Sequence, residues 1–203
     1  MPIDAPQRLV FSDARFHWLN PPPAWQAGEC LDIRTGARTD FWQGTHYGFR
    51  RDDGHVFGLA LTGDFCVETA VRFEGRQQYD QCGLMVRVDA AAWIKCSIEY
   101  EDAQLSRLGS VVTRRGYSDW ATQDLEGGVS AARYRIHRSG ADFLVEASLD
   151  LEGRRWRQLR ICHLDDCPAS LFVGPYACSP VGEAFECRFD YLSIGPSTWS
   201  APA

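Results

Sequence analysis

The chain has 203 residues, of which 45% are hydrophobic and 24% charged, a balance typical of a globular protein rather than a disordered one. Its formal net charge is −6 and its arginines are scattered, which argues against a nucleic-acid partner because such partners select basic surfaces. No apolar run approaches the roughly 20 residues of a membrane helix, and residues 1–18 lack the features of a secretory signal. We therefore expect a cytoplasmic protein with no membrane partner.

Apolar and polar residues alternate in a series of short runs, and no window of a dozen residues sustains a helical stripe. The runs are 29–35, 55–61, 64–73, 82–89, 93–101, 108–114, 132–140, 142–150, 155–164, 170–178 and 185–195. Turn residues separate them at 52–54, 62–64, 126–128, 138–142 and 151–154. This pattern predicts an all-β fold of two antiparallel sheets stacked face to face, with a barrel as the less suitable alternative.

The length fits a single domain over 1–203, with its core at about 9–196. Residues 20–25 indicate an extended, polyproline-like connector near the start of the chain. Residues 195–203 indicate a poorly ordered end. Neither stretch has the length of an interdomain linker.

Two neighbouring runs within 79–102 divide their side chains between an apolar face and a mixed face. The mixed face carries Met85, Arg87, Trp93, Lys95, Ser97 and Glu99. Lys95 is the only lysine in the chain. Because Met and Trp are unusual on a purely solvated face, we interpret this face as the floor of a groove on a concave sheet. The alternative is a solvated face on which Glu99 pairs with Arg87 or Lys95, a weak interaction.

The predicted rim of the groove comes from two aromatic stretches, 39–49 and 114–120, each interpreted as a strand end that runs into a turn. Its members are Trp42, Tyr47, Tyr117, Asp119 and Trp120, while Phe41 and Phe49 are expected to seal the core. Asp80 and Gln81 precede a strand and would reach into the same groove, although Asp80 could instead cap a turn through backbone hydrogen bonds.

Metal and cofactor chemistry find little support in the sequence. Cys162, His163 and Cys167 lack a second pair that would complete a tetrahedral site, and the carboxylates of 50–55 fit a hairpin turn better than a calcium site. We predict no metal and no cofactor, and we expect the eight cysteines to be reduced. For glycoside hydrolysis, only Glu68 and Glu99 qualify as strand-borne carboxylates, and Glu68 could equally be an ion-pair partner on an outer face.

Several stretches together resemble the DUF1349 family, also labelled regulation of enolase protein 1-like. They are 16–25, 39–49, 63–73, 79–102, 110–120 and 173–195, so the resemblance covers nearly the whole chain. It implies a concanavalin A-like jelly roll and no established reaction, and one fungal member is linked to the control of a glycolytic enzyme. Laminarinase-like members of this superfold carry an E-x-D-x-E pattern, but here Tyr100 stands between Glu99 and Glu101.

We therefore predict a non-catalytic protein that binds a polar small ligand, a saccharide or a sugar phosphate, whose anionic part would meet Arg87 and Lys95. One alternative is a glycoside hydrolase-like enzyme that uses Glu99 as acid or base. The other is a protein-interaction or regulatory module that acts on central carbon metabolism. A homodimer formed through a long edge strand is a further prediction.

Overall fold

The computed structural model describes residues 5–200, and every regular element in that range is a β-strand. The strands are β1 (Gln7–Leu9), β2 (His17–Leu19), β3 (Ala24–Ala27), β4 (Leu31–Arg34), β5 (Phe41–Gln43), β6 (Arg50–Asp52), β7 (His55–Thr62), β8 (Cys66–Phe73), β9 (Gln81–Asp89), β10 (Ala92–Tyr100), β11 (Leu105–Arg114), β12 (Tyr117–Glu126), β13 (Ala131–Ser139), β14 (Asp142–Ser148), β15 (Arg157–His163), β16 (Ser170–Cys178) and β17 (Glu186–Gly195). Within this range no helix exists that could span a membrane.

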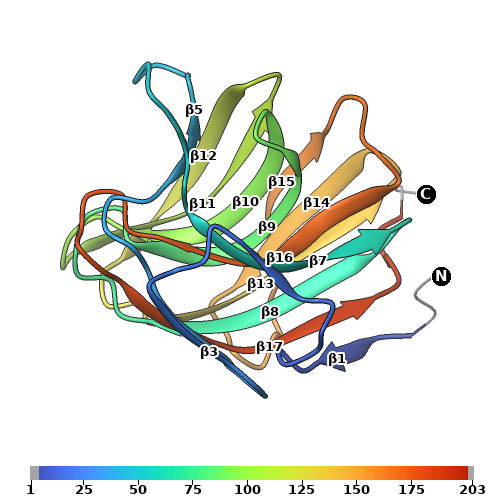
Figure 1. Cartoon of the computed structure of the whole chain (residues 1–203), viewed down its shortest axis with the longest axis horizontal. Helices are drawn as coiled ribbons and strands as arrows, with labels where there is room; N and C mark the ends of the chain where they lie inside the picture. Colours follow the sequence, from blue (N-terminus) through green and yellow to red (C-terminus); the bar gives the residue numbers. More distant parts are fainter. Residues whose placement is uncertain (1–4, 201–203) are drawn as a thin grey trace.

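Two antiparallel sheets lie face to face (Figure 1). The back sheet has eight strands in the order β15-β14-β13-β8-β17-β4-β3, with β1 also paired to β17. The front sheet has seven strands in the order β12-β11-β10-β9-β16-β7-β2. The small β5–β6 hairpin belongs to neither sheet. The predicted all-β, two-sheet antiparallel sandwich is thus confirmed.

The core between the sheets arises from the alternation seen in the sequence. Inward-facing residues of the front sheet, such as Val86 and Ile94, meet those of the back sheet, such as Val71 and Ile136, in one cluster that extends from Leu9 to Ile194. β9 and β10 pair as neighbours, as the division of 79–102 predicts. Because one core joins both sheets, we propose that the chain is a single domain.

Strand β12 was not expected from the sequence. Its residues are mostly polar and exposed because it is an edge strand, so they lack the apolar alternation that marks a strand with a buried face. The preceding Arg115 and Gly116, both at positive φ, form a two-residue turn, and such turns match the twist of paired strands. Tyr117 to Trp120 therefore lie within a strand and not in a turn, which corrects that interpretation.

The stretches near the two ends of the chain differ in regularity. The connector predicted at 20–25 is only partly irregular, because Asn20 turns the chain at φ 55° and β3 begins at Ala24 as the edge of the back sheet. Residues 196–200 form no regular element, and 201–203 lie outside the described residues, so poor order of the tail stays a prediction.

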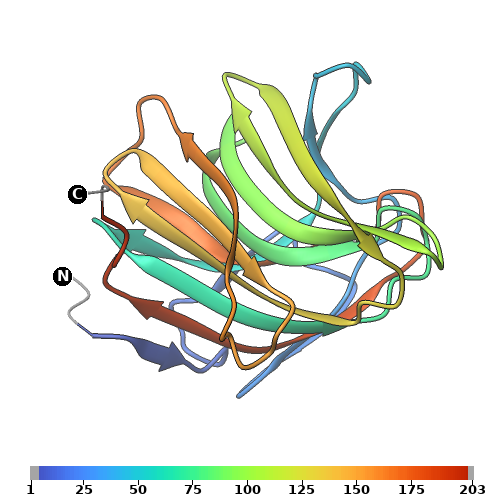
Figure 2. The ribbon, with the colours of Figure 1, turned by 180° about the vertical axis from the view of Figure 1, so that it is seen from behind.

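A second hydrophobic cluster covers part of the front sheet on the side that faces away from the back sheet. We call it the outer cluster; it consists of Phe41, Trp42, Val56, Met85, Trp93, Val111, Tyr176 and Cys178. The front-sheet strands curl toward the β5–β6 hairpin, which rises over this side (Figure 2). The hairpin contributes Phe41 and Trp42 to the outer cluster, so Met85 and Trp93 of the predicted groove floor belong to a small second core.

Candidate ligand-binding cavity

A cavity of about 430 Å³ lies on the curled side of the front sheet, next to the outer cluster. The hairpin, strands β9 to β12 and the loop after β16 enclose it. Its lining residues are Asp40, Trp42, Tyr47, Phe49, Arg51, Tyr79, Gln81, Lys95, Glu99, Val111, Trp120, Pro180 and Val181. Six of the residues predicted for the site therefore line one cavity, and they are Trp42, Tyr47, Gln81, Lys95, Glu99 and Trp120.

The floor of the cavity is a buried polar network centred on Lys95, which is only 2% exposed. Its Nζ donates to Gln81 Oε1 at 2.8 Å and lies 3.5 Å from Asp40 Oδ1. The Tyr176 hydroxyl donates to the same Gln81 oxygen at 3.1 Å. Burial by itself lowers the pKa of Lys95, but the carboxylates Asp40 and Glu99 outweigh burial and leave this pKa raised. Lys95 is therefore a fixed positive charge.

Glu99 is the least satisfied charged group of the cavity. Its side chain is 7% exposed, and no residue within 5–200 gives it a hydrogen bond or an ion pair. Burial raises its pKa to about 7, although the nearby Lys95 pulls the pKa downward. Burial makes the ionised carboxylate costly, and the small exposure that Glu99 keeps is at the cavity, since its oxygens are not among the fully buried atoms without a partner. This group is thus poised to bind a ligand donor.

Aromatic side chains form the walls of the cavity. Tyr47, more than half exposed, stacks on Phe49 with ring centroids 5.8 Å apart and contacts Trp42 at 5.4 Å. The indole Nε1 of Trp42 donates to the Thr45 carbonyl at 3.1 Å, which fixes that ring at the hairpin end. Tyr79 and Trp120 complete the wall. Phe49 was expected to seal the core, but it is 46% exposed at the rim, whereas Phe41 is fully buried as predicted.

Arg87 and Trp93 share a sheet face with Lys95, yet neither lines the cavity. Arg87 donates to both carboxylate oxygens of Asp52 on β6, at 2.8 and 2.7 Å, and is buried beneath the hairpin. Trp93 is fully buried, with its ring 6.1 Å from Phe41. Their assignment to the groove floor is therefore corrected: one anchors the hairpin and the other fills the outer cluster, because the hairpin covers that end of the sheet.

Asp80 has the capping role that the sequence left open. Its carboxylate accepts from the backbone amides of Arg76 and Gln77, at 3.1 and 2.9 Å, and from the hydroxyl of Ser179 at 2.6 Å. It is 1% exposed and does not line the cavity. Asp80 thus orders the loop before β9 and positions the neighbouring Gln81, instead of contacting a ligand.

Tyr117 and Asp119 line a different hollow, of about 820 Å³, at the edge of the front sheet. In the β11–β12 ladder Trp120 lies opposite Val111, a member of the outer cluster, whereas Asp119 lies opposite Val112 of the inner core. Asp119 accordingly turns toward the back sheet and pairs with Arg160 on β15 at 3.0 Å. Trp42, Tyr47 and Trp120 stand between the two hollows.

The sequence interpretation missed several lining residues, above all Asp40. This aspartate precedes β5 and contacts Lys95 from a segment 55 positions away. Its position before an aromatic run was visible in the sequence, but no local pattern indicates that the hairpin folds back over β10. Arg51 on β6 and Tyr79 in the turn before β9 were missed for the same reason, since only the tertiary fold brings them together.

The remaining chemistry-bearing groups lie elsewhere. All eight cysteines are free thiols, and no group of three metal-ligating side chains forms within residues 5–200. Glu68 pairs with Arg133 and accepts from the Tyr191 hydroxyl, on the outer face of the back sheet. Glu68 therefore has the ion-pair role that the sequence left open, and it lies on the other sheet from Glu99.

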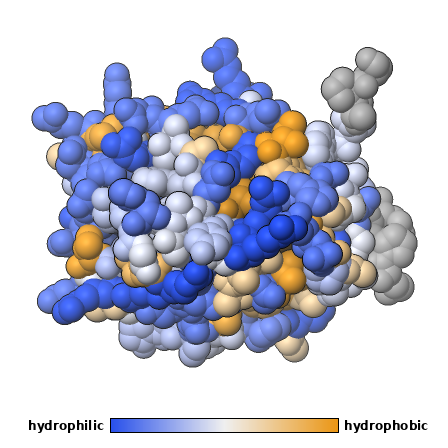
Figure 3. Space-filling model, turned by 90° about the horizontal axis from the view of Figure 1, so that it is seen from above, coloured by the Kyte–Doolittle hydropathy of each residue, from blue (hydrophilic) through white to orange (hydrophobic). Residues whose placement is uncertain are grey.

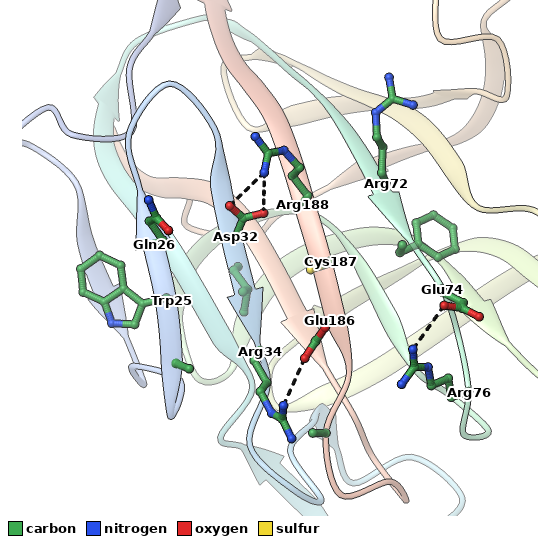
Figure 4. A pocket seen from close by; sticks show the side chains of 14 residues that line it. Trp25, Gln26, Asp32, Arg34, Arg72, Glu74, Arg76, Glu186, Cys187 and Arg188 are labelled. Atoms are coloured by element: carbon green, nitrogen blue, oxygen red, sulfur yellow. Dashed lines mark hydrogen bonds and ion pairs between the residues drawn. The ribbon is translucent and has the colours of Figure 1, made fainter.

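A hollow of about 660 Å³ on the back sheet is the main competing site (Figure 4). Its walls carry paired charges: Arg188 with Asp32, Arg34 with Glu186, and Arg76 with Glu74. Each of these exposed charged groups already has a partner, and exposed ion pairs are solvated and weak. A ligand would therefore gain little binding energy from contacts with this surface. We therefore place the candidate site at the front-sheet cavity.

Loss of the Arg87–Asp52 pair should loosen the hairpin that walls the cavity. Arg87→Ala is expected to reduce the free energy of unfolding by about 1–3 kcal/mol, since Arg87 is buried but Asp52 is one-third exposed. Hydrogen exchange of the β5 and β6 amides should also become faster. The matched control is Arg34→Ala, which breaks an exposed pair and should cost less than about 1 kcal/mol. Unchanged exchange in the hairpin would contradict the anchoring role.

Fold and cavity together define an antiparallel two-sheet β-sandwich with a small-molecule-sized cavity on its curled sheet. The chain belongs to the DUF1349 family, described as "Protein of unknown function (DUF1349)", whose model matches residues 18–197. It is 33% identical over 178 residues to "Regulation of enolase protein 1" of Saccharomyces cerevisiae, with 87% of each chain covered.

Two solved structures illustrate how far the fold extends. A functionally unknown protein from Saccharomyces cerevisiae is 32% identical, with a TM-score of 0.77 over 94% of this chain and 98% of its own. A mutant of the GH43 protein BlXynB from Bacillus licheniformis has a TM-score of 0.70 at 14% identity, over 93% of this chain and 38% of its own. The second likeness shows the shared fold alone.

Proposed function

We propose that this protein binds a hydroxyl-rich small molecule of the saccharide type in the front-sheet cavity. The observation that carries the proposal is the pairing of a buried polar floor, formed by Lys95, Gln81 and Glu99, with aromatic walls. A sugar ring presents an apolar C–H face to an aromatic ring and hydroxyls to polar groups. The cavity volume of about 430 Å³ lies in the range of small-molecule sites.

The charges of the cavity disfavour a sugar phosphate. Arg87 is occupied by Asp52, and Lys95 is shared between Asp40 and Gln81. Glu99 adds a carboxyl that would repel an anion whenever it is ionised. The anionic end that we expected at Arg87 and Lys95 therefore has no unpaired cation to receive it.

Catalysis is a second candidate function, because Asp40 lies in the same cavity as Glu99. A carboxyl with a pKa of about 7 suits a general acid near neutral pH, and glycoside hydrolysis needs a second carboxyl. Lys95 holds Asp40, which gives the two carboxyls distinct environments. Release of reducing sugar from oligosaccharides by the wild type, lost in Glu99→Gln, would favour this function over binding alone.

A role as a regulatory, protein-binding module is suggested by the name of the yeast relative, "Regulation of enolase protein 1". A protein partner would need an apolar contact surface, and Tyr47, Phe49 and Val181 are each about half exposed at the cavity rim. On the face seen in Figure 3, however, hydrophobic surface is divided into small patches among hydrophilic side chains. This face therefore offers no broad apolar surface for a protein interface. The cytoplasmic location and a homodimer stay predictions.

A thermal-shift screen against mono- and oligosaccharides and sugar phosphates tests the proposal. A saccharide at about 100 times its Kd should stabilise the wild type by roughly 2.7 kcal/mol. Trp120→Ala removes one aromatic wall and should abolish the shift, while Trp25→Ala, in the hollow of the back sheet, should retain it. No shift with any saccharide, or an equal loss in both variants, would refute binding at this cavity.

A further inference from the structure

Glu99 has no counter-ion of its own in the cavity, whereas the other charged groups there are paired. Lys95 is held by Asp40 and Gln81, and Arg51 is held by Asp53 at 2.8 Å. Glu99 is more than nine-tenths buried, lines the cavity, and receives no hydrogen bond from residues 5–200. One negative charge is thus left over once the pairs are formed, and it faces the space that a ligand would fill.

The walls around that charge also suit a cation. Trp42, Tyr47, Tyr79 and Trp120 line the same space as Glu99. Aromatic faces carry negative potential and attract ammonium groups, and the attraction grows when water is excluded. Neutral sugars need such rings only for stacking, but an unpaired carboxylate beside them matches a ligand that is positively charged at one point.

We propose that the ligand of this cavity is an amino sugar with a free, protonated amine, whose ammonium group pairs with Glu99 while its ring stacks on the aromatic wall. This proposal rests on the proposed function and narrows its ligand class. The ammonium supplies the hydrogen-bond donors and the positive charge that Glu99 lacks. The hydroxyls of the same ring meet Lys95 and Gln81, which are the remaining polar groups of the floor.

Isothermal titration calorimetry with three probes of similar size tests the ammonium contact: glucosamine, glucose and N-acetylglucosamine. The titrations are run at about pH 7.3, above the Glu99 pKa of about 7 and below the roughly 7.7–8.0 of an amine, so that most of the carboxyl is ionised and most of the amine is protonated. The wild type should bind glucosamine at least about tenfold more tightly than the two uncharged sugars, as expected for a charge-assisted hydrogen bond. Equal affinity for the three probes would overturn the amine proposal and leave saccharide binding intact. Binding of none of them would instead refute the proposed function.

Two variants test whether Glu99 causes the preference for glucosamine over glucose. Glu99→Gln keeps the shape of the side chain but removes its charge, so glucosamine should lose its advantage and the ratio of glucosamine to glucose affinity should fall to about one. Glu101→Gln is the matched control, because Glu101 pairs with Arg107 outside the cavity lining and its loss should leave the ratio unchanged. A preference that survives in Glu99→Gln, or one that disappears in both variants, would overturn the assignment to Glu99.

Discussion

Replacement of Trp93 by alanine is expected to lower the free energy of unfolding by about 3–5 kcal/mol. Trp93 has no exposed surface and fills the outer cluster, where its ring meets Phe41 edge-on at 6.1 Å and lies 5.9 Å from Lys95 Nζ. Truncation would leave a large void beneath the hairpin, because the buried strand β10 cannot close around it. Denaturant unfolding monitored by far-UV circular dichroism measures the change.

Trp25→Ala is the matched control for this prediction. Trp25 is 49% exposed on edge strand β3, so its removal forfeits less buried contact and should cost clearly less than the loss of Trp93. If the two alanine variants were destabilised equally, the outer cluster would not be the second core that the structure shows. A normal slope of free energy against denaturant would confirm that both variants still unfold in one step.

Glu99→Gln is expected to stabilise the protein at pH 8 by up to about 3 kcal/mol and to change little at pH 4. The folded-state pKa of Glu99 is raised from 4.5 to about 7, chiefly by burial, and each pKa unit corresponds to about 1.4 kcal/mol. Because the folded pKa lies above the unfolded one, the stability contributed by protonated Glu99 is complete below about pH 4.5. It is lost as pH rises through about 7. Glutamine, which never ionises, escapes this loss.

The charged groups that act on Glu99 come from several elements. Lys95 on the same strand and Arg107 on β11 lower its pKa, while Asp40 before β5 and Glu101 after β10 raise it. Wild type, Glu99→Gln and Glu101→Gln should be unfolded in denaturant at pH 4, 6 and 8. Glu101→Gln removes a partner of Arg107 and should give no gain at pH 8. A wild type and Glu99→Gln of equal stability at pH 8 would contradict the raised pKa.

The 79–102 stretch shows where sequence reasoning succeeds and where it stops. Its alternation correctly predicts that β9 and β10 pair and which face enters the inner core. The same alternation places Arg87, Trp93, Lys95 and Glu99 together on the opposite face, and they do lie there. It does not reveal that the β5–β6 hairpin buries Arg87 and Trp93. Nor does it reveal that Lys95 and Glu99 remain beside a cavity.

The predicted rim residues show the same limit of sequence reasoning, because strand β12 was not expected. Trp42, Tyr47 and Trp120, which the sequence grouped at one rim, all line the cavity. Tyr117 and Asp119 were grouped with Trp120 as parts of one turn. Since they belong to strand β12, alternation sends Asp119 to the side opposite Trp120, where it meets Arg160 of the back sheet.

The sequence by itself determined the all-β sandwich, its strand pattern and the chemistry available on each strand face, because a period of two is a local property of the chain. Only the tertiary structure decided which of those side chains face a cavity and which carry an unpaired charge. Burial and electrostatic partners are sums over distant segments: Asp52 reaches Arg87 across 35 positions, and Asp40 reaches Lys95 across 55. Glu99 is left without such a partner, and no pattern near position 99 could have indicated it.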